Sequence, residues 1–240
     1  MRRRVAVLRI ASKWTVSRCV AVGVAGLAAT VAVTGCGQTQ LGAAALYSNQ
    51  RISGSKLADE VANLNAAYQK YHDKVQITYP VAEMPRQVLS WMLRFATADR
   101  MAAQRGIVVT PAQAQHELAV ETANVKQAGD TLPEAAVLNG LPPDLLPELG
   151  RWISIQVQLE NQLDHGVAPK TSAGSTALST QVNHLQCLAA KSLNIMVNPQ
   201  YGVYDYGQYA VVGTPSMLST TSPTPGGSQS PAPQTTPKCS

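Results

Sequence analysis

One cysteine near the start of the chain stands in a setting that suits covalent modification. Cys36 follows Thr34 and Gly35, two small residues that let a peptidase approach the backbone closely. A cysteine thiol is the nucleophile that can take a thioether-linked diacylglycerol. The segment therefore predicts cleavage before Cys36 and acylation of its thiol, with this residue as the new N-terminus.

The surroundings of this cysteine indicate an exported protein. The sequence Val-Thr-Gly-Cys at 33–36 resembles a bacterial lipobox, and it closes an uncharged run over 19–33 that follows a start rich in Arg and Lys. A transmembrane helix is the first alternative, but it needs about 20 predominantly apolar residues, and this run is shorter and rich in Ala and Gly. A secreted form cut at an A-x-A site is the second alternative, and no such site follows the run as closely. We expect 1–35 to be a lipoprotein signal peptide and 36–42 a tether lipid-anchored to the extracytoplasmic face of the cell membrane, with the export route left open.

The charge of the chain depends on this processing. The full chain has 19 Lys and Arg against 14 Asp and Glu, and its pI is near 9.1. Residues 1–35 hold six of the basic residues and no acid, so that 13 basic residues and a net charge of −1 remain after cleavage. Nucleic-acid binding needs a basic face on the folded domain, and we exclude that class of partner.

Motifs for catalysis or metal binding are incomplete. His116 and Glu117 are followed at the next helical turn by Val120, where a zinc protease needs a second histidine. The sequence has no Gly-x-Ser-x-Gly motif and no phosphate-binding glycine loop. We therefore expect no catalytic residue, no metal and no cofactor.

Two cysteines remain beside Cys36 after processing. Cys187 and Cys239 could form a disulfide in an oxidising compartment. Cys187 lies in an apolar helical pattern, whereas Cys239 is the penultimate residue of a polar tail. A buried free thiol is therefore the alternative to a disulfide.

Residues 43–212 are expected to form one mostly α-helical domain, a helical bundle with a small β pairing. Capping residues, prolines in first turns and glycines after last turns predict the helix boundaries. The predicted helices begin at a Ser55 cap, run from Pro85 to Gly106, from Thr110 to about 126, from Thr131 to Gly140, over 146–163 and over 178–192. Segments 44–52 and 195–197 read as strands that pair, with 203–212 as the other candidate strand.

The last segment, 213–240, consists almost entirely of Ser, Thr, Pro, Gly and Gln. Such a composition cannot bury enough apolar area to offset the entropy of ordering, so we expect a disordered tail. An O-glycosylated stalk is the alternative to a plain solvated tail.

Several segments together resemble the N-terminal domain of SurA-type periplasmic chaperones, in particular short lipoprotein members of actinobacteria. Segment 45–53 is similar to the opening strand and turn of that family. Segment 88–110 resembles its long helix and Arg-Gly-Ile-x-Val-Thr exit. Segment 140–145, Gly-Leu-Pro-Pro-Asp-Leu, followed by an amphipathic helix, resembles the third segment of that family. Segment 198–202 is like the Asn-Pro-Arg-Tyr-Gly close of its lipoprotein members, so the likeness covers about 43–205.

The resemblance implies binding of unfolded or partly folded exported polypeptides. Full-length relatives often carry parvulin-type prolyl isomerase domains, but the gap over 166–177 is far below the roughly 50 residues of a domain. We therefore expect a chaperone-like protein that is not an enzyme. A scaffold lipoprotein with one specific envelope partner is the main alternative, and a degenerate isomerase module is a third.

Four side chains are candidates for peptide binding, because thioethers and aromatic rings adapt to varied apolar partners. They are Trp91, Met92, Phe95 and Trp152. Trp91 and Phe95 lie four residues apart on one helix face and are the first candidates for an exposed groove. Most large apolar side chains of a domain this size belong to its core.

Overall fold

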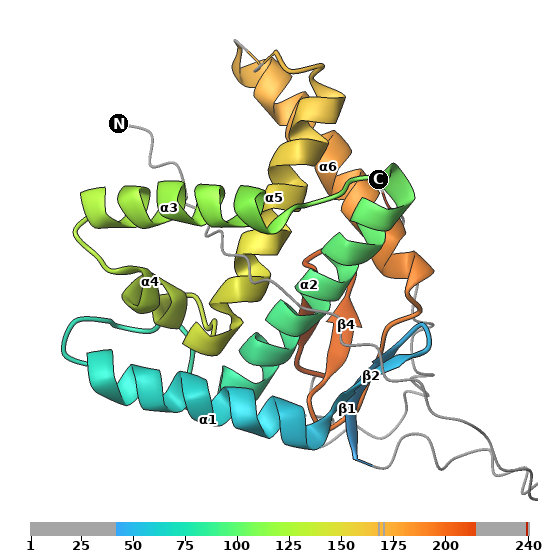
Figure 1. The fold of residues 1–240 in the computed structure, drawn as a ribbon. Coiled ribbons are helices and arrows are strands. Elements are labelled where there is room, and N and C mark those ends of the chain that lie inside the picture. The colour runs from blue at the N-terminus through green and yellow to red at the C-terminus, as the bar shows by residue number, and fades with distance from the viewer. Residues whose placement is uncertain (1–41, 168, 170, 215–238, 240) are drawn as a thin grey trace, which may run out of the picture.

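The computed structural model describes residues 42–167, 169, 171–214 and 239, and in that part the chain is mostly helical (Figure 1). The expectations for the signal peptide, for the tether with Cys36 and for most of the tail lie outside the described residues. The helices are α1 (Gly54–Tyr71), α2 (Met84–Arg105), α3 (Pro111–Gln127), α4 (Leu132–Leu138), α5 (Leu146–Leu163) and α6 (Ser172–Ser192), with 3-10 turns at Val81–Glu83 and Pro143–Leu145. The mostly α-helical prediction is confirmed.

Most helix boundaries follow from residues within one turn of each end. α2 has Pro85 in its first turn and ends at Gly106, whose φ of 65° is left-handed. At the start of α3, the Thr110 N–H donates to Gln113 Oε1 (2.8 Å) and the Gln113 N–H donates to Thr110 Oγ1 (3.2 Å). This reciprocal pair is the capping box that the sequence predicts.

Two helices begin earlier than predicted. α1 is capped by Ser53, whose Oγ accepts from the Lys56 N–H (3.1 Å), so Ser55 lies inside the first turn and is not the cap. α6 begins six residues before 178, because Thr171 Oγ1 accepts from the Gly174 N–H (3.1 Å). The first turns of α6 carry Ser, Thr, Ala and Gly, which hide the helical period in the sequence.

The predicted strand pairing is confirmed. Strand β1 (Ala43–Tyr47) pairs antiparallel with β2 (Gln50–Ser53) on one side and with β3 (Met196–Val197) on the other, with Ala45 opposite Val197. The candidate segment 203–212 does not join this sheet. It forms a separate hairpin of β4 (Val203–Asp205) and β5 (Ala210–Val212).

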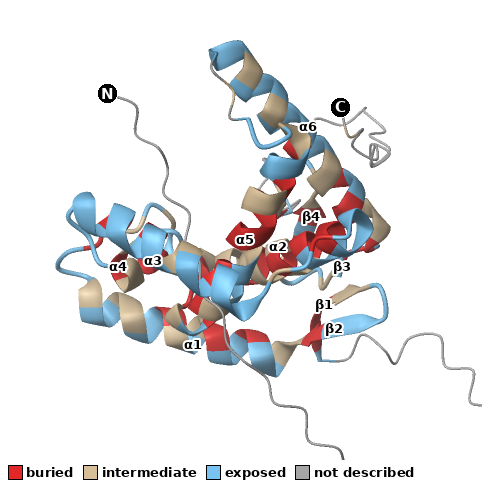
Figure 2. Cartoon of the chain, turned by 45° about the horizontal axis from the view of Figure 1, so that its top comes forward, coloured by how far each residue is buried: buried red, intermediate tan, exposed pale blue. Residues whose placement is uncertain are grey.

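Helix α2 occupies the centre of the molecule and packs against α1, α5, α6 and β5. In Figure 1, α4 lies between α1 and α3 on one side of the molecule. Helices α5 and α6 lie on the other side. Buried residues concentrate on α2 and on the faces turned toward it (Figure 2). Leu89 and Leu93 of α2 and Leu64 of α1 are fully buried, so α2 provides the core against which the other elements are placed.

Cys187 and Cys239 form a disulfide, with their Cα atoms 5.7 Å apart. Of the two alternatives that the sequence left open, the structure therefore has the bond and not the free thiol. His184 Nδ1 also lies 3.0 Å from the carbonyl oxygen of Cys239. Both contacts hold residue 239 against α6.

None of the helices in the described ranges combines the length and the apolar composition that crossing a bilayer requires.

Candidate functional site

The four candidate side chains meet where α5 crosses α2. The Trp91 and Phe95 ring centroids are 5.8 Å apart, and those of Trp91 and Trp152 are 5.9 Å apart at an angle of 88°. Edge-to-face contact of this kind is favourable between aromatic rings. The sequence singled out these residues by type, and the crossing of the two helices brings them together.

Their burial differs from what the sequence predicts at one position. Phe95 is only 9% exposed and belongs to a buried cluster with Leu145, Leu149 and Ile153, so the expectation of an exposed Phe95 is wrong. Trp91, Met92 and Trp152 pack on that cluster and stay partly exposed. The physical reason is that α5 lies directly over Phe95, whereas Trp91 stands one turn earlier at the edge of the contact.

Trp91 is held in place by two polar contacts. Its Nε1–H donates to the carbonyl oxygen of Asn139 (2.9 Å), just after α4. The guanidinium of Arg94 lies 5.0 Å from the centroid of its ring, a cation–π arrangement. A ring held by two such contacts loses little conformational entropy when it binds a partner.

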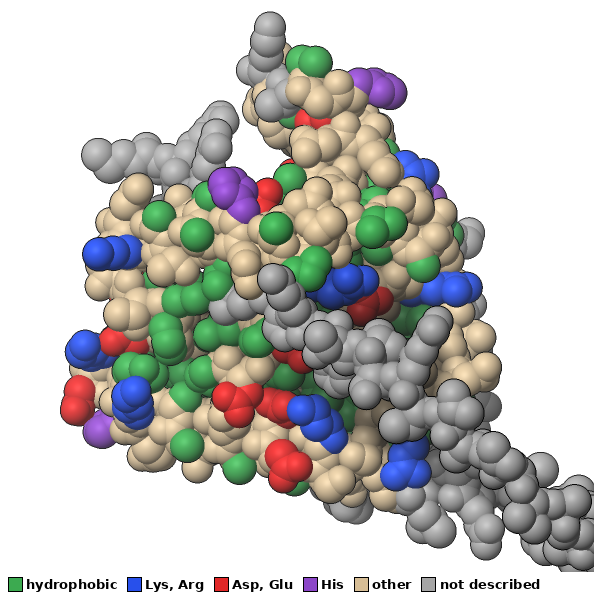
Figure 3. Space-filling model, viewed as in Figure 1, with side chains coloured by type: hydrophobic (Ala, Val, Ile, Leu, Met, Phe, Trp, Pro, Cys, Tyr) green, Lys and Arg blue, Asp and Glu red, His purple; other side chains and the backbone are tan. Residues whose placement is uncertain are grey.

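A set of partly exposed hydrophobic side chains, which we call the apolar surface, covers this cluster. Its members come from α2, α3, α4 and α5, and they are Trp91, Met92, Leu118, Leu132 and Trp152. In Figure 3, hydrophobic side chains gather between α3 and α1, and acidic and basic side chains lie at the border. This combination of an apolar centre and a charged rim is the usual composition of a protein interaction site.

Two hollows flank the α2–α5 crossing. The first, the hairpin hollow, has a volume of about 460 Å³ and lies between the β1–β2 hairpin, α1, α2 and the start of α5. Met92 and Phe95 reach it, beside the charged side chains of Asp99 and Glu148. Burial raises the pKa of the Glu148 carboxyl.

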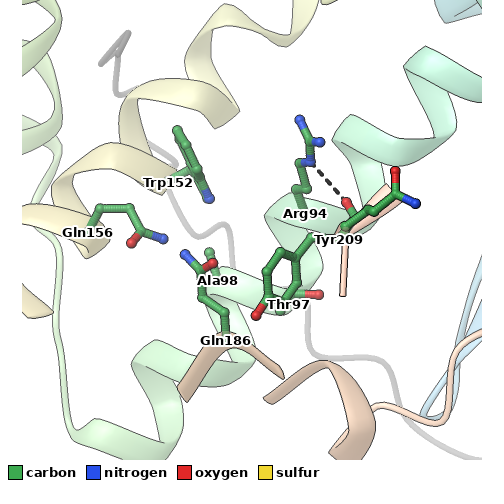
Figure 4. Close-up of a pocket in the computed structure, with 8 residues that line it drawn as sticks. Arg94, Thr97, Ala98, Trp152, Gln156, Gln186 and Tyr209 are labelled. Carbon is green, nitrogen blue, oxygen red and sulfur yellow. Dashed lines mark hydrogen bonds between the residues drawn. The ribbon is translucent and has the colours of Figure 1, made fainter. Parts of the chain in front are cut away.

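The second, the α6 hollow, has a volume of about 240 Å³ and lies between α2, α5, α6 and the β4–β5 turn (Figure 4). Trp152 lines it together with Arg94, Gln156 and Tyr209. Burial lowers the pKa of the Arg94 guanidinium, because removal from water disfavours its charged form. Trp152 therefore belongs both to the apolar surface and to the α6 hollow beside it.

The residues of the α6 hollow other than Trp152 were not predicted from the sequence. Arg94 stands between Trp91 and Phe95 in the chain, and this was the only local signal that pointed to it. Tyr209 lies in a segment that reads as a strand and a turn. Its carbonyl accepts from Arg94 Nε (2.9 Å) across 115 positions of sequence, a contact that no local pattern indicates.

Over the described ranges, no three His, Cys, Asp or Glu side chains come close enough together to hold a metal ion.

The chain matches no known protein-family model, no curated protein and no solved structure. The likeness to SurA-type chaperones thus depends on the sequence segments given above and stays a prediction.

Proposed function

We propose that this protein is a lipid-anchored, extracytoplasmic chaperone of SurA-like type that binds unfolded or partly folded exported polypeptides without catalysis. The observation that carries the proposal is the apolar surface, where two tryptophans and a methionine stay partly exposed at the crossing of α2 and α5. Aromatic rings offer a large contact area, and a thioether adapts its shape to different partners. A surface of this kind suits weak binding to many apolar segments.

The proposed location has support of its own. Cys36 stands in a lipobox-like sequence, and the two remaining cysteines of the processed chain form a disulfide. Disulfides persist in oxidising compartments and are rare in the cytosol. We therefore place the domain outside the cytoplasm, attached to the membrane through the acylated Cys36.

The client proposal is tested by suppression of aggregation. The purified domain should reduce light scattering by several unrelated unfolded proteins, and it should leave the rate of prolyl-peptide isomerisation at background. Protection of no client, together with recovery of one tight envelope partner, would support the scaffold alternative and refute the chaperone. Clear isomerase activity would refute the non-catalytic part.

The apolar surface is tested by two substitutions within it and by one control substitution outside it. Met92→Gln places an amide in the apolar surface, and Trp91→Ala removes its largest fixed ring. We expect Trp91→Ala to weaken client binding about tenfold and Met92→Gln somewhat less, as at the centre of other interfaces. Met196→Gln is the control, because Met196 is 54% exposed on β3, outside the apolar surface. Equal losses in Met92→Gln and Met196→Gln would show that the surface has no special role.

The anchor is tested by Cys36→Ser. Without the thiol there is no site for a thioether-linked lipid, so we expect the variant to stay unprocessed or to leave the membrane fraction. Fractionation and mass spectrometry of the N-terminus measure both outcomes. A Cys36→Ser protein that is processed and sediments with membranes as the wild type does would exclude this anchor.

A further inference from the structure

Two side chains that line the α6 hollow, Arg94 and Gln156, carry hydrogen-bond donors for which the described residues supply no acceptor. Arg94 uses Nε to bond the Tyr209 carbonyl (2.9 Å), and no carboxylate in the described part of the chain lies within ion-pair distance of its guanidinium. Gln156 is only 9% exposed, and its Nε2 has no hydrogen-bond partner among the described residues. A buried donor without an acceptor costs free energy, so such a group at a hollow is a candidate contact for a ligand.

Arg94 and Gln156 line the hollow from two different helices, α2 and α5. In Figure 4, the amide nitrogens of Gln156 and Gln186 and the indole nitrogen of Trp152 point toward one space. Arg94 lies on the other side of that space, where its Nε bonds the Tyr209 carbonyl and its terminal nitrogens point away from the two glutamines. The Trp152 and Tyr209 rings and Ala98 supply apolar walls. The lining thus combines one cation, several N–H donors and apolar surface.

The outer wall of the hollow is held by hydrogen bonds within the protein. Asp205 Oδ1 accepts from the backbone N–H groups of Gly207 (2.7 Å) and Gln208 (3.1 Å), which fixes the β4–β5 turn. The Tyr209 hydroxyl donates to the carbonyl of Asn183 in α6. A preformed site binds with a smaller loss of entropy than a site that must be ordered by its ligand.

We propose that the α6 hollow binds the C-terminal carboxylate of a polypeptide, with Arg94 and Gln156 on the carboxylate oxygens and the last side chain against Trp152. A guanidinium without a carboxylate partner among the described residues matches a carboxylate ligand in charge and in shape. The volume of about 240 Å³ lies below the roughly 300–1,000 Å³ of pockets for drug-sized ligands, which fits the end of one chain. This inference rests on the proposed function, because it assumes that polypeptides bind the apolar surface. The α6 hollow would then favour polypeptides whose C-terminus lies beside that surface.

The experiment compares one short, apolar, fluorescent peptide in two forms, with a free C-terminal carboxylate and with a C-terminal amide. We expect the free acid to bind the wild-type protein at least about tenfold more tightly, because hydrogen bonds to a charged group are the stronger ones. Arg94→Gln should abolish this preference. Equal binding of acid and amide would refute the carboxylate site and leave the chaperone proposal intact.

A matched pair on α5 guards against effects of misfolding. Gln156→Leu removes the unpartnered amide from the hollow and should reduce the preference for the acid without loss of stability. Gln158→Leu is the control, because the Gln158 Nε2 is also buried without a partner among the described residues, but Gln158 does not line the hollow. A preference for the acid that persists in Gln156→Leu, or that falls equally in Gln158→Leu, would overturn the assignment.

A further arm distinguishes the source of the carboxylate. An N-acetylated amino acid should bind much more weakly than the peptide, because it lacks the residues that contact the apolar surface. Equal affinity would show a site for small carboxylic acids and refute the assignment to polypeptide ends. Failure of the domain to protect any unfolded client would refute the proposed function separately, since that assay does not depend on the C-terminus.

Discussion

Phe95→Ala is expected to lower the free energy of unfolding by about 3–5 kcal/mol, the usual cost of truncating a buried phenylalanine to alanine. The Phe95 side chain is 9% exposed and lies in the cluster that joins α2 to α5. Its removal would leave a cavity beneath Trp91, whose ring centroid is 5.8 Å away. Equilibrium unfolding in urea, followed by circular dichroism, measures the loss.

The control for Phe95→Ala is Val108→Ala, in the connection between α2 and α3. Val108 is 76% exposed, so its truncation should change stability by no more than about 0.5 kcal/mol. Measuring both stability and client binding of Phe95→Ala also shows whether Phe95 acts in the core or in the binding surface. A Phe95→Ala protein that unfolds at the wild-type urea concentration but no longer binds clients would show that Phe95 belongs to the binding surface.

Cys239→Ser is expected to lower the free energy of unfolding by about 2–4 kcal/mol, because it removes the cross-link to Cys187. The bond closes a loop with a sequence separation of 52 residues. Opening a loop of this length increases the freedom of the unfolded chain, which is the main origin of the effect in the chain-entropy account. Urea unfolding of the oxidised wild type and of the variant measures the difference.

Reduction of the wild type provides the control for Cys239→Ser. Dithiothreitol should lower the stability of the wild type to that of the variant, and it should leave the variant unchanged. A Cys187→Ala, Cys239→Ser double variant should behave like the reduced wild type. Insensitivity of the wild type to the reductant would contradict a stabilising disulfide.

The candidate site was only partly predictable from the sequence. Trp91, Met92 and Trp152 were chosen because of their side-chain chemistry, and all three are partly exposed around one helix crossing. Residue type does not reveal which face of α2 another helix covers, which is why Phe95 was placed on the wrong side of the boundary between core and surface. Arg94 and Gln156 were not predicted. The hollow that they line exists only where α2, α5 and the β4–β5 turn come together in the fold.

The helix ends could be predicted because they depend on neighbours in the chain. The Thr110 and Gln113 pair, the left-handed Gly106 and the proline after Met84 act within a single turn, and the sequence contains all the information they need. The same locality explains the error at α1, where Ser53 and Ser55 are both plausible caps two residues apart. The strand preceding Ser53 decides between them, since Ser53 is also the last residue of β2.

The amino-acid sequence by itself determined the class of fold, most helix boundaries and the pairing of β1 with β3. Each of these follows from short-range hydrogen bonding and from the period of apolar residues. Tertiary structure alone decided which aromatic side chains stay exposed, that Cys187 bonds to Cys239, and that Arg94 and Gln156 share a hollow. Burial and contact at these positions depend on groups that lie far apart in the chain, as Arg94 and Tyr209 do. These contacts and the burial of these side chains depend on how α5, α6 and the β4–β5 hairpin pack on α2.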